Sequence, residues 1–262
     1  MTTHRVVQIT DCHLFADPAQ ALRGIVTWPR FVAVLEDVRQ QVPDADLLVI
    51  TGDTAHDEAR ATYEAVREAL TDWTGRVRII PGNHDNRADL RELFPTAQDG
   101  PAGRVTFSET WDEWQVIGLD SQRPGELAGS LGDEQLEWLQ SCLRATAQLP
   151  TLLFLHHSPI PVQSPWLDRI GLQDAAAFER ILRDHLHVRL ICCGHVHQEV
   201  VGSLGGAATF TTPAVGPPFR PRTEQLEIDS APPGYRVLEL QADGRWSTQV
   251  LRAASQSALP GS

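Results

Sequence analysis

The stretch Val6-Val7-Gln8-Ile9-Thr10-Asp11-Cys12-His13 joins an apolar run, which predicts a β-strand, to two side chains that can bind a metal. A carboxylate and an imidazole are a common start for a site that holds a borderline divalent cation. In extended backbone, side chains two residues apart point the same way, so Asp11 and His13 would face one ligand. An Asp-x-His pair alone is common by chance, so its meaning depends on the rest of the chain.

Four further islands of metal-binding residues have the same form, namely Gly52-Asp53, Gly82-Asn83-His84-Asp85, Leu155-His156-His157 and Gly194-His195-Val196-His197. They follow apolar runs that predict strands at 47–50, 77–80, 151–155 and 188–193. Asp53 and Asn83 could each be a turn residue or a helix cap. By contrast, His195 and His197 follow a buried strand, where they have no packing role that a hydrophobic residue would not fill better, which favours metal binding.

Helices alternate with the first three predicted strands. Thr27-Trp28-Pro29 predicts a helix start with Thr27 as the N-cap, and Glu58 to Trp73 has helical spacing of its apolar residues. This order favours a parallel or mixed sheet covered by helices, with the ligand-bearing loops beyond the carboxyl ends of the strands. Further patterns predict strands at 104–107, 114–119, 200–203, 207–212, 235–240 and 246–251, helices from Gly132-Asp133 and over 173–186, and a proline-rich loop over 212–233.

No linker divides the 262 residues, so we expect a single domain over 1–252 and a flexible C-terminal tail over 253–262. The apolar runs are far shorter than the ~18 residues of a membrane span, and the start of the chain lacks the pattern of a secretory signal. The four cysteines have no paired spacing, which argues against a disulfide framework. The cytoplasm is therefore the expected compartment, with no membrane partner.

The formal net charge of -12 argues against a nucleic-acid polymer as the partner, because binders of nucleic acids usually present a basic stripe. An anionic substrate would need a local positive charge, which a metal centre would supply. Three histidines with three carboxylate or amide groups, and His156 in addition, are too many donors for one catalytic ion. Seven ligands with one bridging carboxylate fit two metals roughly 3.5–4 Å apart.

In this order and at these intervals, the five islands resemble those of the calcineurin-like metallophosphoesterases. Other stretches resemble the bacterial class III 3′,5′-cyclic-AMP phosphodiesterases: Gln8 to Phe15, Glu126-Leu127 ahead of Gln135 to Leu139, Trp166-Leu167-Asp168, Cys193 to Glu199 and Ala231 to Arg236. The likeness covers nearly the whole chain. It implies an α/β fold, a four-layer αββα sandwich of two mixed central sheets flanked by helices.

The resemblance also implies how the ligands divide. A first metal would be held by Asp11, His13, Asp53 and His197, and a second by Asp53, Asn83, His156 and His195, with Asp53 as the bridge. The donors suit Fe, Mn, Zn and Co; Fe and Mn are the expected metals, with Zn or Co as alternatives. His157 competes with His156 for the ligand role. Cys12 should point away from the metals, and Asp85 and Asp120 could either orient histidines or be turn residues.

The function implied is hydrolysis of 3′,5′-cyclic nucleotides, with cAMP converted to 5′-AMP by attack of a metal-bridging hydroxide on phosphorus. His84 would be the catalytic group that binds the phosphoryl oxygen or protonates the leaving 3′-oxygen. The substrate would contact His13, Asp53, Asn83, His84 and His197.

Several alternatives stay open from the sequence. The enzyme could act on other small diesters such as 2′,3′-cyclic nucleotides or glycerophosphodiesters, or on a nucleotide-sugar lipid pyrophosphate, and the fold could serve as a non-catalytic binding scaffold. The base of a nucleotide could meet a rim formed from Trp28, Trp166, Phe219 or Arg23. The oligomeric state stays open between a monomer and a homodimer.

Overall fold

The computed structural model describes residues 3–73, 75–95, 100–101 and 103–254. Its first sheet has the strand order β13-β12-β1-β4-β5. The strands β1, β4 and β5 are parallel, whereas β12 and β13 are antiparallel to their neighbours. Their bounds are β1 (Thr3–Ile9), β4 (Leu47–Thr51), β5 (Arg76–Ile80), β12 (Gly234–Gln241) and β13 (Trp246–Arg252).

The second sheet has the order β10-β11-β9-β8-β7-β6 and is also mixed. The strands β7, β8, β9 and β11 run parallel, and an antiparallel strand closes each edge. Their bounds are β6 (Phe107–Thr110), β7 (Gln115–Gly118), β8 (Thr151–Phe154), β9 (Val188–Cys193), β10 (Val200–Leu204) and β11 (Ala207–Thr211), and a separate short hairpin pairs β2 (Ala21–Leu22) with β3 (Ile25–Val26).

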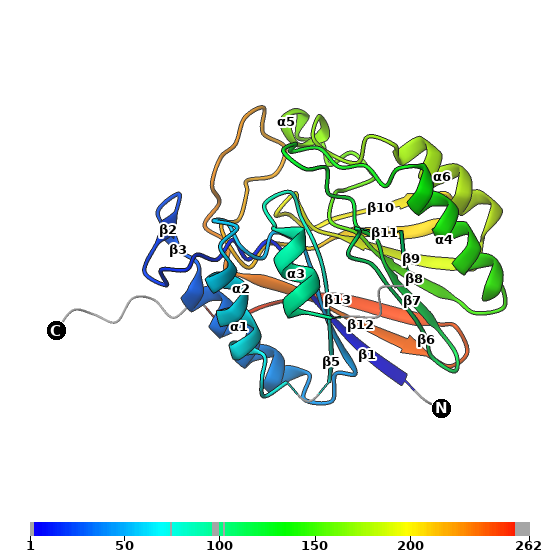
Figure 1. Cartoon of the computed structure of the whole chain (residues 1–262), viewed down its shortest axis with the longest axis horizontal. Coiled ribbons are helices and arrows are strands. Elements are labelled where there is room, and N and C mark those ends of the chain that lie inside the picture. The colour runs from blue at the N-terminus through cyan, green and yellow to red at the C-terminus, as the bar shows by residue number, and fades with distance from the viewer. Residues whose placement is uncertain (1–2, 74, 96–99, 102, 255–262) are drawn as a thin grey trace.

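Three buried cores hold the layers together. One lies between the two sheets and includes Trp114, Leu152 and Leu238. A second joins the first sheet to α1 (Trp28–Gln41), α2 (Arg60–Ala69) and α3 (Arg87–Leu93), and a third joins the second sheet to α4 (Asp133–Ala145) and α6 (Ala175–Asp184). The helices thus cover the outer face of each sheet (Figure 1). The predicted αββα sandwich is confirmed.

Several local predictions need correction. The strand expected at 104–107 begins only at Phe107, because Arg104 and Val105 bond to the loop around Asp120 instead of to a neighbouring strand. The sequence patterns also missed α3, the β2-β3 hairpin and the one-turn helix α5 (Pro165–Asp168). Thr27 stands at the N-cap of α1 as predicted, but its hydroxyl donates to the carbonyl oxygen of His13 at 3.0 Å instead of capping the helix.

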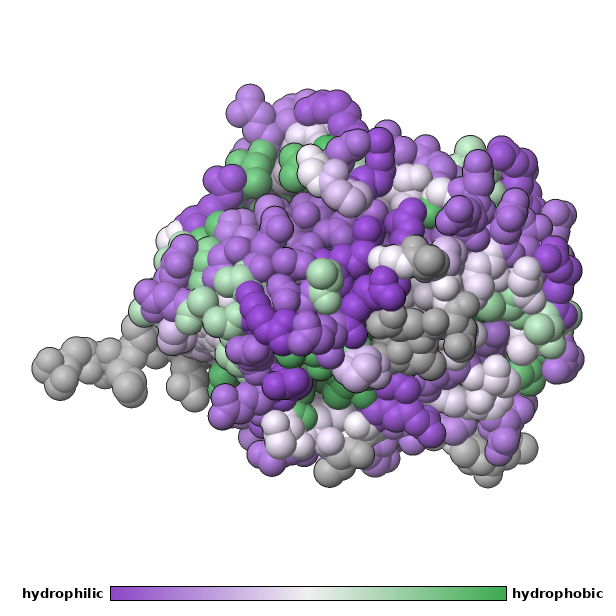
Figure 2. Space-filling view, viewed as in Figure 1, coloured by the Kyte–Doolittle hydropathy of each residue, from purple (hydrophilic) through white to green (hydrophobic). Residues whose placement is uncertain are grey.

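The ends and the surface of the chain bear on the remaining predictions. Residues 255–262 of the predicted tail lie outside the described residues, and the domain limits of 1–252 stay a prediction. No helix among the described residues combines the length and the hydrophobicity of a membrane span. On the face drawn in Figure 2, hydrophobic residues form separate patches among hydrophilic ones.

The core between the sheets gives a test of the fold. Leu152→Ala should lower the free energy of unfolding by about 2–5 kcal/mol, because the fully buried side chain would leave a cavity. Leu186→Ala is the matched control and should change stability by less than about 0.5 kcal/mol, since Leu186 is 68% exposed. Urea unfolding followed by circular dichroism measures both. Equal destabilisation by the two substitutions would contradict this assignment of the core.

Candidate metal centre

All five islands lie at the carboxyl ends of strands that belong to both sheets. The parallel register pairs Ile9 with Ile50 and Thr51 with Ile80, so β1, β4 and β5 end nearly level. In the second sheet, Phe154 of β8 pairs with Cys192 of β9. Residues that follow these strands therefore emerge at one edge of the sandwich, as the alternation of strands and helices predicts.

The backbone of this edge is strained. Asp11, His13, Asp53, His195 and His197 have φ angles of 53°, 49°, 51°, 69° and 56°, in the left-handed region that side-chain-bearing residues rarely adopt. Each such residue costs on the order of 1 kcal/mol or more, and such strain concentrates at functional sites. The expectation that Asp11 and His13 lie in extended backbone is therefore wrong, although both side chains do point into one site.

Hydrogen bonds between the loops hold this strained backbone. The amide of Asp11 donates to the carbonyl oxygen of Gly52 at 3.0 Å, and that of His13 donates to the carbonyl oxygen of Asp53 at 2.8 Å. The loops after β1 and β4 therefore stay paired beyond their strands. Gly52 has a φ of 89°, and a Cβ there would lie 2.5 Å from Nδ1 of His156. The loops approach so closely that only glycine fits at this position.

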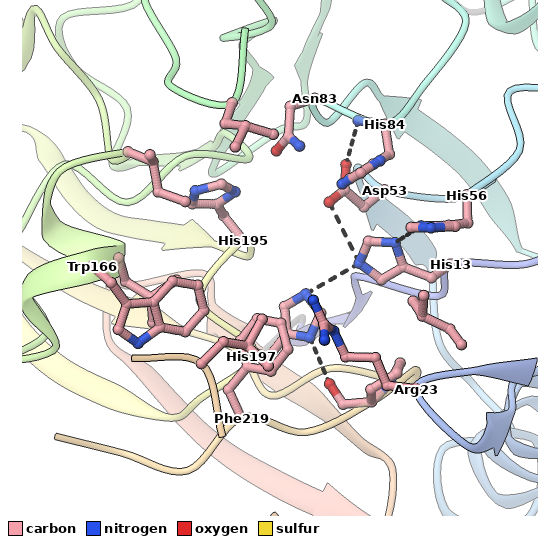
Figure 3. A pocket seen from close by; sticks show the side chains of 16 residues that line it. His13, Arg23, Asp53, His56, Asn83, His84, Trp166, His195, His197 and Phe219 are labelled. Atoms are coloured by element: carbon pink, nitrogen blue, oxygen red, sulfur yellow. Dashed lines mark hydrogen bonds and ion pairs between the residues drawn. The ribbon is translucent and has the colours of Figure 1, made fainter. Parts of the chain in front are cut away.

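The imidazole nitrogens meet in two pairs around one carboxylate. Nε2 of His13 lies 3.1 Å from Nε2 of His197, and Nε2 of His156 lies 3.3 Å from Nδ1 of His195. Oδ2 of Asp53 is 3.5 Å from Nε2 of both His13 and His156. Figure 3 shows His13, Asp53, His195 and His197 directed into one cavity. A carboxylate between two pairs of nitrogen donors is the arrangement expected for two cations with a shared ligand.

Backbone amides fix both carboxylates. The amide of His84 donates to Oδ1 of Asp53 at 2.9 Å, and the amide of His195 donates to Oδ1 and Oδ2 of Asp11 at 3.1 Å and 3.0 Å. Oδ1 of Asp11 then lies 3.4 Å from Nε2 of His197. Oδ1 of Asn83 is buried without a hydrogen-bond partner among the described residues. A desolvated amide oxygen beside this cluster fits the role of a metal ligand.

Burial and charge set the protonation of the cluster. Burial lowers the pKa of His13 and of His195 to about 3, so both rings are neutral at neutral pH and can offer a lone pair. Burial raises the pKa of the Asp53 carboxyl, but the neighbouring His156 and His13 outweigh this effect and hold it well below its usual range. Burial also lowers the pKa of His156, yet Asp53 raises it to about 9. Asp53 thus favours a positive charge beside it.

The donor set fits divalent metals of the Fe, Mn, Zn and Co type, which accept imidazole and carboxylate together. The buried residues Asp11, His13, Asp53 and His197 place one ligand atom each within 4.8 Å of one another, as do His156, His157 and His195. The sequence islands thus assemble into a buried histidine and aspartate cluster.

His157 is bonded to the protein through both ring nitrogens. Nδ1 lies 2.8 Å from Oγ of Ser121, and Nε2 lies 3.2 Å from the carbonyl oxygen of Leu127. His156, in contrast, directs Nε2 toward Asp53. His157 therefore anchors a neighbouring loop and has no ring nitrogen left for a cation.

The suggestion that Asp85 and Asp120 orient histidines is wrong. The carboxylate of Asp85 accepts the amides of Thr54, Ala55 and Gly82 and the hydroxyl of Tyr63. Asp120 is fully buried and pairs with Arg87 at 2.7 Å and 3.0 Å. Both aspartates therefore shape loops, which is the turn-residue alternative.

The cysteines nearest the site are part of the cores. Cys12 packs in the core under α1 and α2, which confirms that its side chain turns away from the ligands. Cys192 faces the core between the sheets, and Cys193 faces the core under α4 and α6.

His56 is the site residue that the sequence patterns missed. Its Nδ1 lies 3.2 Å from Nδ1 of His13, and its ring centroid lies 4.8 Å from that of His84. A hydrogen bond at this distance requires that one of the two nitrogens carries the proton and donates it, while the other nitrogen is the acceptor. His56 stands three residues after Asp53, between the strand predicted at 47–50 and the helix predicted from Glu58, and its nearness to His13 depends on the pairing of two loops that no short-range pattern reports.

A cavity of about 310 Å³ opens onto the cluster. Its polar side includes His13, Asp53, Asn83 and the rings of His56 and His84, and its other side is apolar. Of the four candidates for a nucleotide rim, Arg23, Trp166 and Phe219 line this cavity. Trp28 does not, because its indole donates to the carbonyl oxygen of Phe15 and its ring packs on Phe31.

Known proteins resemble this chain over nearly its whole length. It is 38% identical to the 3′,5′-cyclic adenosine monophosphate phosphodiesterase CpdA of Escherichia coli strain K12, over 98% of this chain and 92% of that protein. It is 37% identical to the protein of the same name from Vibrio vulnificus, with the same coverage. A probable cyclic nucleotide phosphodiesterase of Synechococcus is also 37% identical, over 95% of this chain and 92% of that protein.

Among solved structures, a dimetal phosphatase from Danio rerio has the same fold, with a TM-score of 0.69 over 96% of this chain and 99% of that one, at 17% identity. The family model for the calcineurin-like phosphoesterases matches residues 4–199, which hold all five ligand islands. The chain therefore belongs to the calcineurin-like phosphoesterase family.

Proposed function

We propose that this protein is a metal-dependent phosphodiesterase that hydrolyses 3′,5′-cyclic nucleotides, with cAMP converted to 5′-AMP. The observation that carries the proposal is the Asp53 carboxylate between two pairs of imidazole nitrogens, at the bottom of a cavity large enough for a small molecule. The names of the relatives that match over nearly the whole chain support the choice of substrate.

The ligand assignment follows the two nitrogen pairs. Asp11, His13 and His197 would hold one divalent cation together with Asp53. The second would be held by His156, His195 and Asn83, again with Asp53. Iron and manganese are the proposed metals, with zinc or cobalt as alternatives, because the donors do not discriminate among them.

Two bound cations would supply a water of lowered pKa as the nucleophile and positive charge for the phosphate oxygens. This local charge explains how a chain with a net charge of -12 would bind an anion. The neutral rings of His13 and His195 would offer lone pairs to the cations without adding positive charge of their own.

His84 is proposed as the group that serves the leaving oxygen. Its ring lines the cavity, with its centroid 5.2 Å from that of the His13 ring, and its backbone amide donates to Oδ1 of Asp53. As the water oxygen bonds to phosphorus and the bond from phosphorus to the 3′-oxygen breaks, that oxygen gains negative charge. His84 would give it a proton or a hydrogen bond, and such a group contributes roughly 10²–10⁴-fold.

The compartment and the partners are part of the proposal. The described residues include all four cysteines and form no disulfide, which suits a reducing compartment such as the cytoplasm. The absence of a nucleic-acid or membrane partner stays a prediction, and the oligomeric state stays open between a monomer and a homodimer.

The first prediction separates metal binding from catalysis. Asp53→Ala should lose the metals and the activity together, because the shared carboxylate is gone. His84→Ala should keep the metal content and lower kcat by roughly 10²–10⁴-fold. Elemental analysis beside steady-state kinetics measures both. Full turnover by the metal-stripped protein would contradict the mechanism.

The second prediction concerns His56. If Nε2 of His13 binds a cation, its Nδ1 donates to His56, and loss of such an acceptor typically costs about 10–100-fold in metal affinity or activity. His56→Phe should weaken the binding of Mn²⁺ accordingly, whereas His56→Gln, which offers an oxygen acceptor, should weaken it less. Competition with a chelating indicator measures the affinity. His185→Phe, remote from the cavity, is the control, and an unchanged affinity in His56→Phe would exclude this role.

The third prediction concerns the substrate. With Mn²⁺ or Fe²⁺ added, kcat/KM should be higher for cAMP than for 2′,3′-cAMP. Turnover of bis(p-nitrophenyl) phosphate without turnover of cAMP or cGMP would retain the reaction class and reject the cyclic-nucleotide substrate in favour of another small diester.

A further inference from the structure

The cavity above the metal centre has a second wall that the hydrolytic chemistry does not use. This wall is apolar and is formed by Leu22, Leu127, Trp166, Ile170, Phe219 and Leu226. A cyclic phosphate diester is small and anionic, and the polar side of the cavity alone would bind it. The apolar wall therefore fits a flat or hydrophobic part of the substrate.

Trp166 is held in place by a small core of its own. It lies on the one-turn helix α5, and it packs with Val162, Leu167 and Val196. The amide of Arg222 donates to Oγ of Ser164 at 3.0 Å, which ties the loop over 212–233 to the start of this helix. Because Val196 stands between His195 and His197, the core that positions Trp166 is continuous with the ligand loop.

The two aromatic rings on the wall are not equivalent. Phe219 lies flat on His197, with ring centroids 3.8 Å apart and planes 4° apart, so one of its faces is already covered. Its centroid is 5.3 Å from that of Trp166, which is too close for a base to insert between the two rings in parallel. Phe219 thus supports His197 and contacts Trp166 at a tilt of 59°, whereas Trp166 has no stacked ring among the described residues and lies beside the cavity (Figure 3).

Leu127 completes the wall from the opposite loop. Its side chain is 57% exposed although it lines the cavity, and its carbonyl oxygen lies 3.2 Å from Nε2 of the buried His157. The loop is therefore anchored beside the metal centre while its leucine faces solvent. A ligand that covered this side chain would gain the free energy of its burial.

We propose that Trp166, Leu127 and Ile170 form the binding site for the nucleobase, which rests on the proposed cyclic-nucleotide activity. The base packs by its flat face on the indole, while the cyclic phosphate lies at the polar side of the same cavity. Recognition is through stacking and hydrophobic contact. A purine offers a larger face than a pyrimidine, so cyclic purine nucleotides are favoured over cyclic pyrimidine nucleotides.

The test compares substrates with and without a base. Trp166→Ala should lower kcat/KM for cAMP by about 10–100-fold, mainly through KM, because stacking of one base on an aromatic ring has an effect of this size. The same variant should leave kcat/KM unchanged for the base-free analogue 1-O-methylribose 3′,5′-cyclic phosphate. Trp166→Phe should restore most of the loss, and 3′,5′-cyclic CMP should have a higher KM than cAMP with the unmodified protein.

Trp138→Ala is the matched control, because Trp138 is also a partly buried tryptophan but lies on α4, where it packs against the core of the second sheet and does not line the cavity. Trp138→Ala should leave kcat/KM unchanged for both cAMP and the base-free analogue. An equal loss on cAMP and on the base-free analogue in Trp166→Ala would overturn the base site and leave the proposed function standing, as would equal kcat/KM for the two substrates with the unmodified protein. Turnover of bis(p-nitrophenyl) phosphate without turnover of cAMP would overturn the proposed function itself and the base site with it.

Discussion

The Asp53 carboxylate between two pairs of histidine nitrogens is the interaction on which the rest of the site depends. One oxygen accepts the amide of His84, and the other lies 3.5 Å from Nε2 of both His13 and His156. This position requires a left-handed backbone at Asp53 and glycine on the facing loop, since a Cβ at Gly82 would come within 2.4 Å of the Asp53 amide. The strain is sustained by hydrogen bonds between loops, and it brings the side chains of both sheets to one point.

Both sheets contribute to the site. Asp11, His13, Asp53 and Asn83 follow strands of the first sheet, whereas His156, His195 and His197 follow strands of the second. The distances between these donors therefore depend on how the sheets pack, and the core between the sheets is both the centre of the fold and the support of the site. A close-packed core changes little in shape, which suits a site whose ligand atoms must stay within a few tenths of an ångström.

The cavity combines two chemistries on opposite sides. The polar side has the neutral imidazoles of His13 and His195 and the Asp53 carboxylate, which favour cations, so a positive centre can exist in an acidic protein. The apolar side is held by α5, by the loop over 212–233 and by the loop around Leu127. The same histidine pair, His156 and His157, serves both sides: one ring faces Asp53, and the other anchors the Leu127 loop.

The sequence by itself determined the strands that precede the five islands and the αββα class, and it predicted the seven residues proposed as ligands but not His56. It could do so because each island follows an apolar run and because the order of the islands resembles that of a family. It misplaced the start of the strand at 104–107, since the Arg104 side chain and the Val105 amide donate hydrogen bonds to Asp120, which lies about fifteen residues away in the chain.

Only the tertiary structure decided the roles that depend on contacts between distant loops. These include the nearness of His56 to His13, the use of Asp85 as a holder of backbone amides, the use of both nitrogens of His157, and the choice of Trp166 over Trp28 as a cavity residue. The physical reason is that strand and helix periodicity report which face of an element is buried. They do not report which loops meet once two sheets have packed.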